Sequence, residues 1–337
     1  MAIGSHTIPR FYLEQFAKPS KRKGKPGDVW TYEKGKPTHR RSTRSQGYQN
    51  GYFAYVKEDG IADESFESHL AVLEDRCAEV LVSAKSQLFD LKSLAYKNQL
   101  GFYAGMLFAR STVRRKFSES NWAKLQTPFA QLESDENYLR DAAAHYSEVI
   151  GETVTLENIT NAIRGVAATF TNKKLTGNSF IKDLLFHAEM LKGEVVPRPW
   201  QVLKAPARTE FITSDNPVVT FIKLEQDLWH PGHGLRKPGV VVAFPLAPTA
   251  CLTIGVEGRE FEEVDAATVM RMNDVVVRCC DRFVYSRTLS KEIEAMVNAV
   301  SRTSVPGETA FVGALPGTEQ IQQYLRKQIG MQEAKRP

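Results

Sequence analysis

The hydrophobic pattern of this 337-residue chain switches from a helical to a strand-like period near residues 196–200, and this change constrains the fold more than any other feature. Before it, apolar side chains recur every three or four residues between 66 and 84, as in one stripe of an amphipathic helix. Further helical patterns cover about 94–117, 133–149, 156–169 and 178–192. After the change, apolar runs bounded by turn residues predict strands near 210–222, 240–244, 251–256 and 283–285.

This order of helices, then strands, then helices predicts an α+β protein rather than a doubly wound parallel sheet. We expect a helical N-terminal and middle portion packed on a small, mostly antiparallel sheet from the C-terminal half. Asp265 and Ser290 are expected to cap the N-termini of two late helices. The expected parts form one compact unit: a basic segment with short strands over 1–60, a helical region over 61–200, a sheet region over 201–290, and C-terminal helices and a tail over 291–337.

Several protein classes are disfavoured by the sequence. Neither GxGxxG nor GxxxxGK[ST] occurs, which argues against a Rossmann or P-loop enzyme. The four cysteines have no CxxC spacing, so neither a zinc ribbon nor a secreted disulfide framework is expected. The chain begins without a basic-then-apolar leader, and its longest uncharged stretch, 239–256, is typical of two strands around a turn rather than a membrane span. We therefore expect a cytoplasmic protein.

Positive charge is concentrated in the first 50 residues, which hold eleven Lys and Arg against three acidic residues, while the whole chain carries only +5. Such a segment can attract phosphate backbones. The alternative is a solvated, flexible loop that the lysines keep soluble. The candidate nucleic-acid-binding residues are Arg10, Lys21, Arg22, Lys23, Lys25, Arg40, Arg41 and Arg44.

Two segments together carry a family resemblance. His6-Thr-Ile-Pro-Arg-Phe-Tyr-Leu13, followed by Phe16, resembles the HxxPRFYLxxF opening of the family catalogued as domain of unknown function 4238. Phe211-Ile-Thr-Ser-Asp-Asn-Pro217 resembles the FxTSDxP motif of that family. Phe244-Pro-Leu-Ala-Pro248 resembles its later PLSP-like segment, with an alanine in place of the serine.

The resemblance extends over about residues 6–286. Glu67, Leu70 and Glu74 stand where the family tends to have an ExxLxxxE helix, Arg110 where a helix carries an arginine, and Trp200 shortly before the TSD strand. The resemblance implies family membership but no activity, because the family is described as uncharacterised.

A first candidate site combines one histidine with carboxylates. Glu67 and Glu74 are two helical turns apart, so they share a helix face about 10 Å apart along the axis. Asp215 falls at a strand end, where scaffolds often present catalytic groups. Such a set could hold Mg²⁺ or Mn²⁺ for phosphodiester hydrolysis, or act as an acid–base pair on water. The candidate catalytic residues are His6, Glu67, Glu74, Arg110 and Asp215.

The same residues also have a purely structural interpretation. Glu74 or Glu67 would pair with Arg110, Asp215 would cap its own turn, and His6 would satisfy a buried backbone group. The sequence leaves both interpretations open.

A second candidate site is the pair Arg140 and His145 on an expected helix. Its spacing is similar to the Arg-polar-xxx-His pattern of HEPN-type ribonucleases. The histidine would be the general acid or base, and the arginine would stabilise developing phosphorane charge without a metal. The alternative is a surface helix with ordinary charges.

The leading functional hypothesis is a hydrolase directed at nucleic acid, a nuclease acting as an intracellular toxin or antiviral effector through the His/carboxylate set. The alternatives are a non-catalytic module that binds nucleic acid or protein, a HEPN-like metal-independent ribonuclease, and a small-molecule hydrolase. A nuclease would turn over its substrate, whereas a binding module would show salt-sensitive affinity only.

Overall fold

The structure is a computed structural model, and it describes residues 4–20, 24–50, 52, 55–56, 62–63, 65–85, 90–116, 132–171, 177–224, 229–235 and 237–300. The chain divides into two compact units, one made of 1–116 with 176–311 and the other of 117–175 with 312–337. The sequence pattern alone predicts a single unit.

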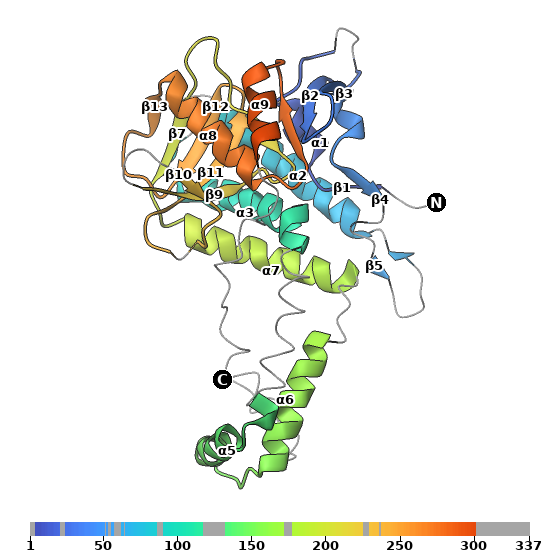
Figure 1. Ribbon diagram of the computed structural model, residues 1–337, viewed down its shortest axis with the longest axis vertical. Coiled ribbons are helices and arrows are strands. Elements are labelled where there is room, and N and C mark those ends of the chain that lie inside the picture. Colours follow the sequence, from blue (N-terminus) through green and yellow to red (C-terminus); the bar gives the residue numbers. More distant parts are fainter. Residues whose placement is uncertain are drawn as a thin grey trace. The chain divides into compact units, whose positions relative to one another are not determined.

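The first unit contains every described strand (Figure 1). Its helices are α1 (Arg10–Glu14), the 3₁₀ turn η1 (Thr43–Ser45), α2 (Ser65–Lys85), α3 (Leu94–Arg110), α7 (Gly177–Val195), α8 (Ala266–Cys279) and α9 (Lys291–Ala299). Its strands are β1 (Gly4–His6), β2 (Asp28–Glu33), β3 (His39–Ser42), β4 (Tyr48–Asn50), β5 (Tyr55–Val56), β6 (Ala62–Asp63), β7 (Trp200–Lys204), β8 (Thr213–Ser214), β9 (Val219–Lys223), β10 (Trp229–Pro231), β11 (Val240–Ala247), β12 (Ala250–Ile254), β13 (Phe261–Glu263) and β14 (Phe283–Ser286).

The main sheet has the order β10-β9-β11-β12-β7-β13, and all its strands come from residues 200–263. Its pairs are antiparallel except β13 with β7, which is parallel. Helices packed on a mostly antiparallel sheet from the C-terminal half confirm the α+β prediction.

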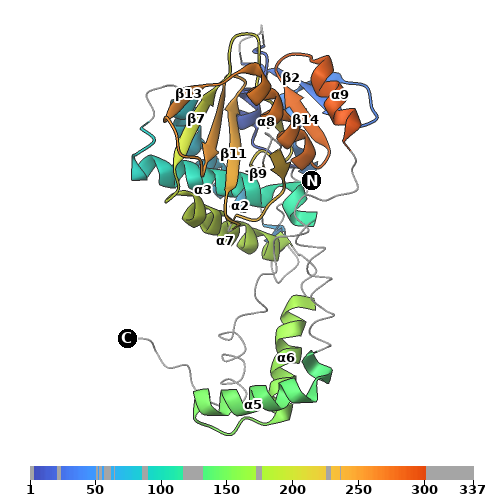
Figure 2. The same ribbon diagram turned by 60° about the vertical axis from the view of Figure 1, so that its left-hand side comes forward.

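Helices cover both faces of the main sheet, so every residue of β11 is buried (Figure 2). Because successive side chains of a strand point to opposite faces, Val242 and Phe244 pack in the cluster formed with α2, α3 and α7. Val241 and Ala243 pack in the cluster formed with α8 and α9. This arrangement explains why the strand is a continuous apolar run rather than an alternating pattern.

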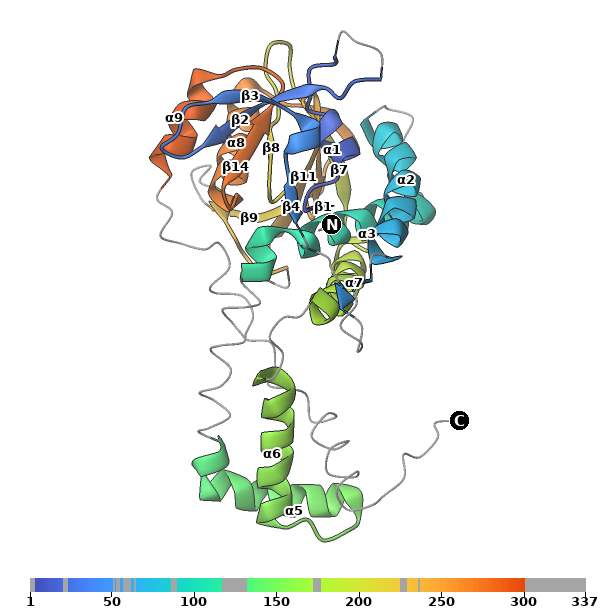
Figure 3. The same cartoon turned by 90° about the vertical axis from the view of Figure 1, so that its right-hand side faces the viewer.

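A second sheet, of order β3-β2-β14-β8, brings the N-terminal segment against residues far along the chain (Figure 3). In it Trp30 pairs with Ser286, and Val284 pairs with Ser214. The basic N-terminal segment therefore supplies two of the four strands of this sheet, β2 and β3.

The predicted N-caps of the two late helices are confirmed. The Asp265 Oδ1 accepts the backbone N–H of Thr268 at 2.7 Å, at the start of α8. The Ser290 Oγ accepts the N–H of Ile293 at 3.2 Å, at the start of α9. Each bond satisfies a backbone donor that the first helical turn leaves without an intrahelical partner.

The second unit contains α5 (Glu136–Ile150) and α6 (Leu156–Thr171). Asp135 caps the N-terminus of α5, and Gly151 ends it in the left-handed conformation. A separate apolar cluster, with Tyr146 and Ile159 among its members, holds the two helices together. Among the described residues, no helix of either unit is long and apolar enough to cross a membrane.

Candidate functional site

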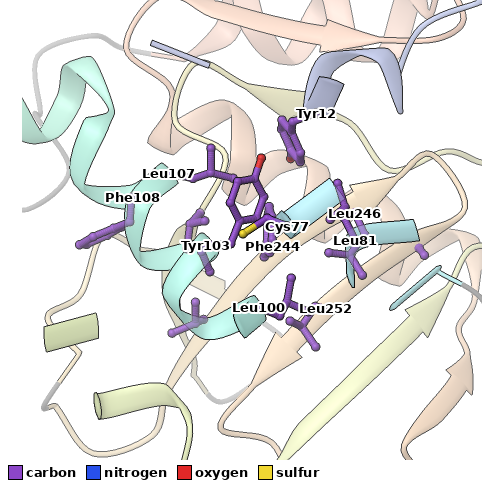
Figure 4. Packing of buried hydrophobic residues seen from close by; sticks show 14 of the residues in the cluster. Tyr12, Cys77, Leu81, Leu100, Tyr103, Leu107, Phe108, Phe244, Leu246 and Leu252 are labelled. Carbon is purple, nitrogen blue, oxygen red and sulfur yellow. The ribbon is translucent and has the colours of Figure 1, made fainter. Parts of the chain in front are cut away.

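The Tyr12 hydroxyl joins all three motif segments of the first unit. It donates to the carbonyl oxygen of Pro245 at 2.7 Å and lies 2.8 Å from the Thr213 hydroxyl, whose hydrogen it can accept. Its ring stacks on Phe244 with 5.6 Å between centroids, inside the apolar cluster (Figure 4). The segments around residues 6–13, 211–217 and 244–248 therefore meet in a buried packing centre.

The Asp215 carboxylate binds backbone groups of residues 281–283, whereas the His6 carbonyl binds Arg110. The Asp215 Oδ1 accepts the N–H of Asp281 at 2.8 Å, and its Oδ2 accepts the N–H groups of Arg282 and Phe283 at 2.7 and 2.8 Å. Burial raises the pKa of Asp215 to about 6, although these three donors favour the ionised form. The carboxylate thus caps the turn between α8 and β14, rather than its own turn as the structural interpretation predicts.

His6, Glu74 and Arg110 do come together. Arg110 Nη1 donates to Glu74 Oε1 at 2.5 Å, and its Nη2 donates to the backbone oxygen of His6. The Arg110 side chain is 2% exposed, so this ion pair is largely removed from water. The Tyr52 hydroxyl donates to the Arg110 carbonyl at 3.1 Å, which fixes the C-terminal end of α3. Of the two partners that the structural interpretation predicts for Arg110, Glu74 and Glu67, the structure shows Glu74 in the ion pair.

The His6 imidazole lies at the rim of this cluster. Burial is the main cause that lowers its pKa, a backbone hydrogen bond with Arg44 opposes that shift, and the charge of Arg110 adds to it. Its Nε2 is buried and has no hydrogen-bond partner among the described residues. The ring of Tyr48 packs edge-on against it, with 5.5 Å between centroids. At neutral pH the imidazole is thus uncharged, the form that a general base requires.

A small cavity next to Glu74 and Arg110 limits what this cluster can hold. Its volume is about 10 Å³, room for about one water molecule. The hydroxyl of Tyr103, which also lines the cavity, is buried without a partner among the described residues. Cys77 lines it too, but burial raises the pKa of its thiol to about 12, so the thiol is protonated at neutral pH. The cavity can hold a bridging water but no organic substrate.

The described residues contain no group of three or more His, Cys, Asp or Glu side chains that could hold a metal ion. Glu67 belongs to α2, but its side chain lies outside the described part of the chain. The Mg²⁺ or Mn²⁺ hypothesis therefore has no set of ligands among the described residues.

The basic segment is partly described. Lys21, Arg22 and Lys23 lie outside the described residues, whereas Lys25 is exposed. Arg40 on β3 pairs with Asp28 at 3.0 Å. Arg10, Arg41 and Arg44 are exposed on α1, β3 and η1 and form no ion pair with another described residue.

The alternative pair, Arg140 and His145, lies on α5 of the second unit. Both side chains are exposed, and Arg140 Nη2 pairs with Glu136 at 3.0 Å, one turn earlier. Five residues of α-helix rotate by about 140°, so the two side chains leave the helix in different directions. The HEPN-like assignment stays a prediction.

The comparison with protein families gives one match. The profile of the family described as "Protein of unknown function (DUF4238)" matches residues 5–290. The chain belongs to this family. No curated protein and no solved structure matches it. The matched segment includes the Tyr12, Thr213 and Pro245 contacts and the cluster of His6, Glu74 and Arg110.

Proposed function

We propose that this DUF4238 protein binds nucleic acid through the basic surface that its N-terminal segment forms on the first unit. The observation that carries this proposal is that Arg10, Arg41 and Arg44 are exposed and have no ion-pair partner among the described residues. They stand on α1, β3 and η1, elements with fixed backbones, so less conformational entropy is lost on binding than for arginines of a free loop.

These elements also lie close to one another. The α1 helix packs on η1, and the Glu14 carboxylate of α1 accepts a hydrogen bond from the Thr43 hydroxyl of η1. Arg10 and Arg44 both influence the pKa of the His6 imidazole. The charge of Arg10 lowers it, and a hydrogen bond with the backbone of Arg44 raises it. Arginines carried by elements that lie close together suit phosphate oxygens, which each guanidinium can bind with two hydrogen bonds.

Salt-dependent binding tests the proposal. A variant with Arg10→Gln, Arg41→Gln and Arg44→Gln should bind oligonucleotides more weakly, whatever their sequence. Its plot of log affinity against log salt should be flatter by about 2–3 units, because each phosphate that an arginine no longer neutralises reduces the slope by about 0.7–0.9. The control removes the same charge from other exposed positions through Lys92→Gln, Lys237→Gln and Lys291→Gln. Equal affinities for the two variants would contradict the proposal.

Hydrolysis at His6 is the second candidate, favoured by the neutral imidazole between Arg110 and the exposed Arg10. The imidazole would accept a proton from a nucleophile, and the arginines would stabilise phosphate charge. In the described arrangement Nε2 is covered, so a substrate would have to displace the Tyr48 ring. Cleavage of RNA or DNA that persists in EDTA and disappears in His6→Gln would support this candidate. Cleavage abolished by EDTA would instead support the metal-dependent nuclease hypothesis.

A further inference from the structure

A second, larger pocket of the first unit lies beside the basic N-terminal segment and was not anticipated from the sequence. Its volume is about 280 Å³, close to the lower end of the range for small-molecule sites, about 300–1,000 Å³. The lining residues are Lys18, Trp30, Arg40, Arg287, Thr288 and Leu289. Three of the six are cations, two are apolar and none is a carboxylate.

The second sheet assembles this lining from distant parts of the chain. Trp30 on β2 stands directly opposite Arg40 on β3 and opposite Ser286 on β14. Arg287, Thr288 and Leu289 follow β14 immediately. The backbone of Lys18 pairs with the backbone of Asp28, the first residue of β2. Trp30 therefore stands between Arg40 and Ser286 across the sheet, and Arg287 follows Ser286 along the chain.

The three cations are only partly neutralised. Arg40 pairs with Asp28 at 3.0 Å, but both side chains are exposed to water, where such a pair is weak. Arg287 Nη2 donates to the backbone oxygen of Gln15 at 3.2 Å, a neutral acceptor, and its Nε is buried without a partner among the described residues. Lys18 is exposed and makes no ion pair with a described residue. Glu210, which does not line the pocket, accepts the Thr288 hydroxyl at 2.7 Å.

The apolar part of the lining is also accessible. Leu289 is 54% exposed, one of the more exposed large apolar side chains of the described residues. Trp30 is half-buried, with part of its ring against the α8 and α9 cluster. An indole face and an isobutyl group that remain in contact with water gain stability when a flat apolar group covers them.

From these contacts we infer that the pocket binds a phosphorylated nucleoside, with its base on Trp30 and Leu289 and its phosphate on Lys18, Arg40 and Arg287. This inference rests on the proposed function and names the unit of ligand that the basic surface would recognise. Phosphate alone would leave the indole uncovered, and a neutral nucleoside would leave Lys18 and Arg287 without an anionic partner among the described residues and Arg40 with only its exposed pair to Asp28. Bases of any sequence can stack on an aromatic ring, so the pocket suits one nucleotide without base selectivity.

Titration calorimetry of the whole protein with AMP, adenosine and inorganic phosphate tests the inference. AMP should bind at least tenfold more tightly than either of the other two, because only AMP uses both halves of the pocket. Lys18→Gln and Arg40→Gln should each weaken AMP binding by about fivefold to tenfold. The exposed Lys92→Gln should leave it unchanged. Equal binding of AMP and phosphate, or AMP binding that neither Lys18→Gln nor Arg40→Gln reduces, would overturn the inference.

Stacking needs a separate variant, because Trp30 also packs on the core. Trp30→Phe keeps an aromatic ring and should bind AMP less tightly, and Leu289→Ser changes an exposed position and should do the same without loss of thermal stability. Full AMP affinity in both variants would exclude stacking and with it a nucleoside ligand.

Binding of oligonucleotides shows whether the ligand is a strand end or a free nucleotide. It also distinguishes a failure of this inference from a failure of the proposed function. A single strand with a 5′-phosphate that competes with AMP would assign the pocket to a strand end, and tight AMP binding without such competition would assign it to a free nucleotide. The Arg10, Arg41 and Arg44 variant should lose oligonucleotide affinity yet keep AMP affinity. If AMP does not bind while oligonucleotides still bind through those arginines, the inference fails and the proposed function stands. If AMP binds but the arginine variant keeps full oligonucleotide affinity, the proposed function fails instead.

Discussion

Arg110 is the residue whose burial matters most for the first unit, because a guanidinium that is 2% exposed must have its charge compensated. In Arg110→Ala the Glu74 carboxylate loses its partner while it remains largely buried. We expect the free energy of unfolding to fall by about 3 kcal/mol, the lower end for a broken buried pair since Glu74 is 22% exposed. Urea denaturation measures this.

Arg140→Ala is the matched control for that variant. Arg140 is 65% exposed, and its one ion pair among the described residues is with Glu136 on the same helix. Its removal should change the free energy of unfolding by about 0.5 kcal/mol or less. Equal losses of unfolding free energy in the two variants would show that the buried pair of Arg110 with Glu74 contributes no more to stability than an exposed pair. Loss of a ribonuclease activity in Arg140→Ala without loss of stability would favour the HEPN-like alternative.

Asp215 should make stability depend on pH in an unusual direction. Its folded-state pKa of about 6 lies above the value near 3.9 of an unfolded aspartate. The folded state then holds the proton more tightly, so the contribution to stability is present at low pH and is lost as pH rises from about 4 to about 6. The stability of the wild type minus that of Asp215→Asn should thus fall by about 2–3 kcal/mol between pH 4 and pH 7.

Urea denaturation at several pH values checks this dependence. Asp265→Asn is the control, because hydrogen bonds with Thr268 lower the pKa of this exposed cap. The unfolding free energy of the wild type minus that of Asp265→Asn should therefore rise with pH. A difference for Asp215→Asn that is constant from pH 4 to pH 7 would contradict the prediction, because it would mean that the three N–H donors offset the effect of burial on the pKa.

The Tyr12 hydroxyl offers a test of the link between the motifs. Tyr12→Phe leaves the Thr213 hydroxyl and the Pro245 carbonyl without this partner in a buried site. We expect a loss of about 1–3 kcal/mol in the free energy of unfolding. In Tyr285→Phe the removed hydroxyl is also buried but has no partner among the described residues, so stability should be unchanged or higher. The prediction is wrong if the two variants unfold at the same denaturant concentration.

At the scale of elements, α3 and α7 approach each other closely at Gly105. A Cβ placed there would overlap the backbone of Ala188, which cannot rotate away as a side chain can. Gly105→Ala should therefore destabilise the unit by about 1–3 kcal/mol, as overpacking of a core does. Gly193 on α7 has open space around it, so Gly193→Ala should stabilise the helix by about 0.5–1 kcal/mol. Thermal melts of both variants give the comparison, and a neutral Gly105→Ala would contradict the close approach.

For the whole molecule, each unit has its own hydrophobic core. The two large clusters consist of residues from the first unit, and the cluster around Tyr146 consists of residues from the second. A variant that ends at residue 311 and has 117–175 replaced by about 20 Gly and Ser residues, which span about 25 Å, should still fold. A cooperative thermal transition with a near-ultraviolet circular dichroism signal checks this. A broad, uncooperative transition would show that the first unit depends on the second.

Local features of the sequence determined the helices, their caps and the fold class. Three- and four-residue apolar spacing marks α2 and α3, and Asp265 and Ser290 mark helix starts, because these signals act between residues within one or two turns. The need of Arg110 for a carboxylate from α2 also followed from the sequence, since a charge in an apolar stripe needs a partner, whereas the structure decided that Glu74 rather than Glu67 is seen in that pair. The family predicted from the resemblance of the motif segments is confirmed by the match over residues 5–290.

Only the tertiary structure decided which distant residues meet. The pairing of β2 with β14 joins residues about 250 positions apart, and Asp215 binds backbone groups of 281–283. The pocket around Trp30 gathers residues of 18–40 with residues of 287–289 for the same reason. No local period encodes such contacts, because they depend on which apolar faces are buried together once the sheets have formed.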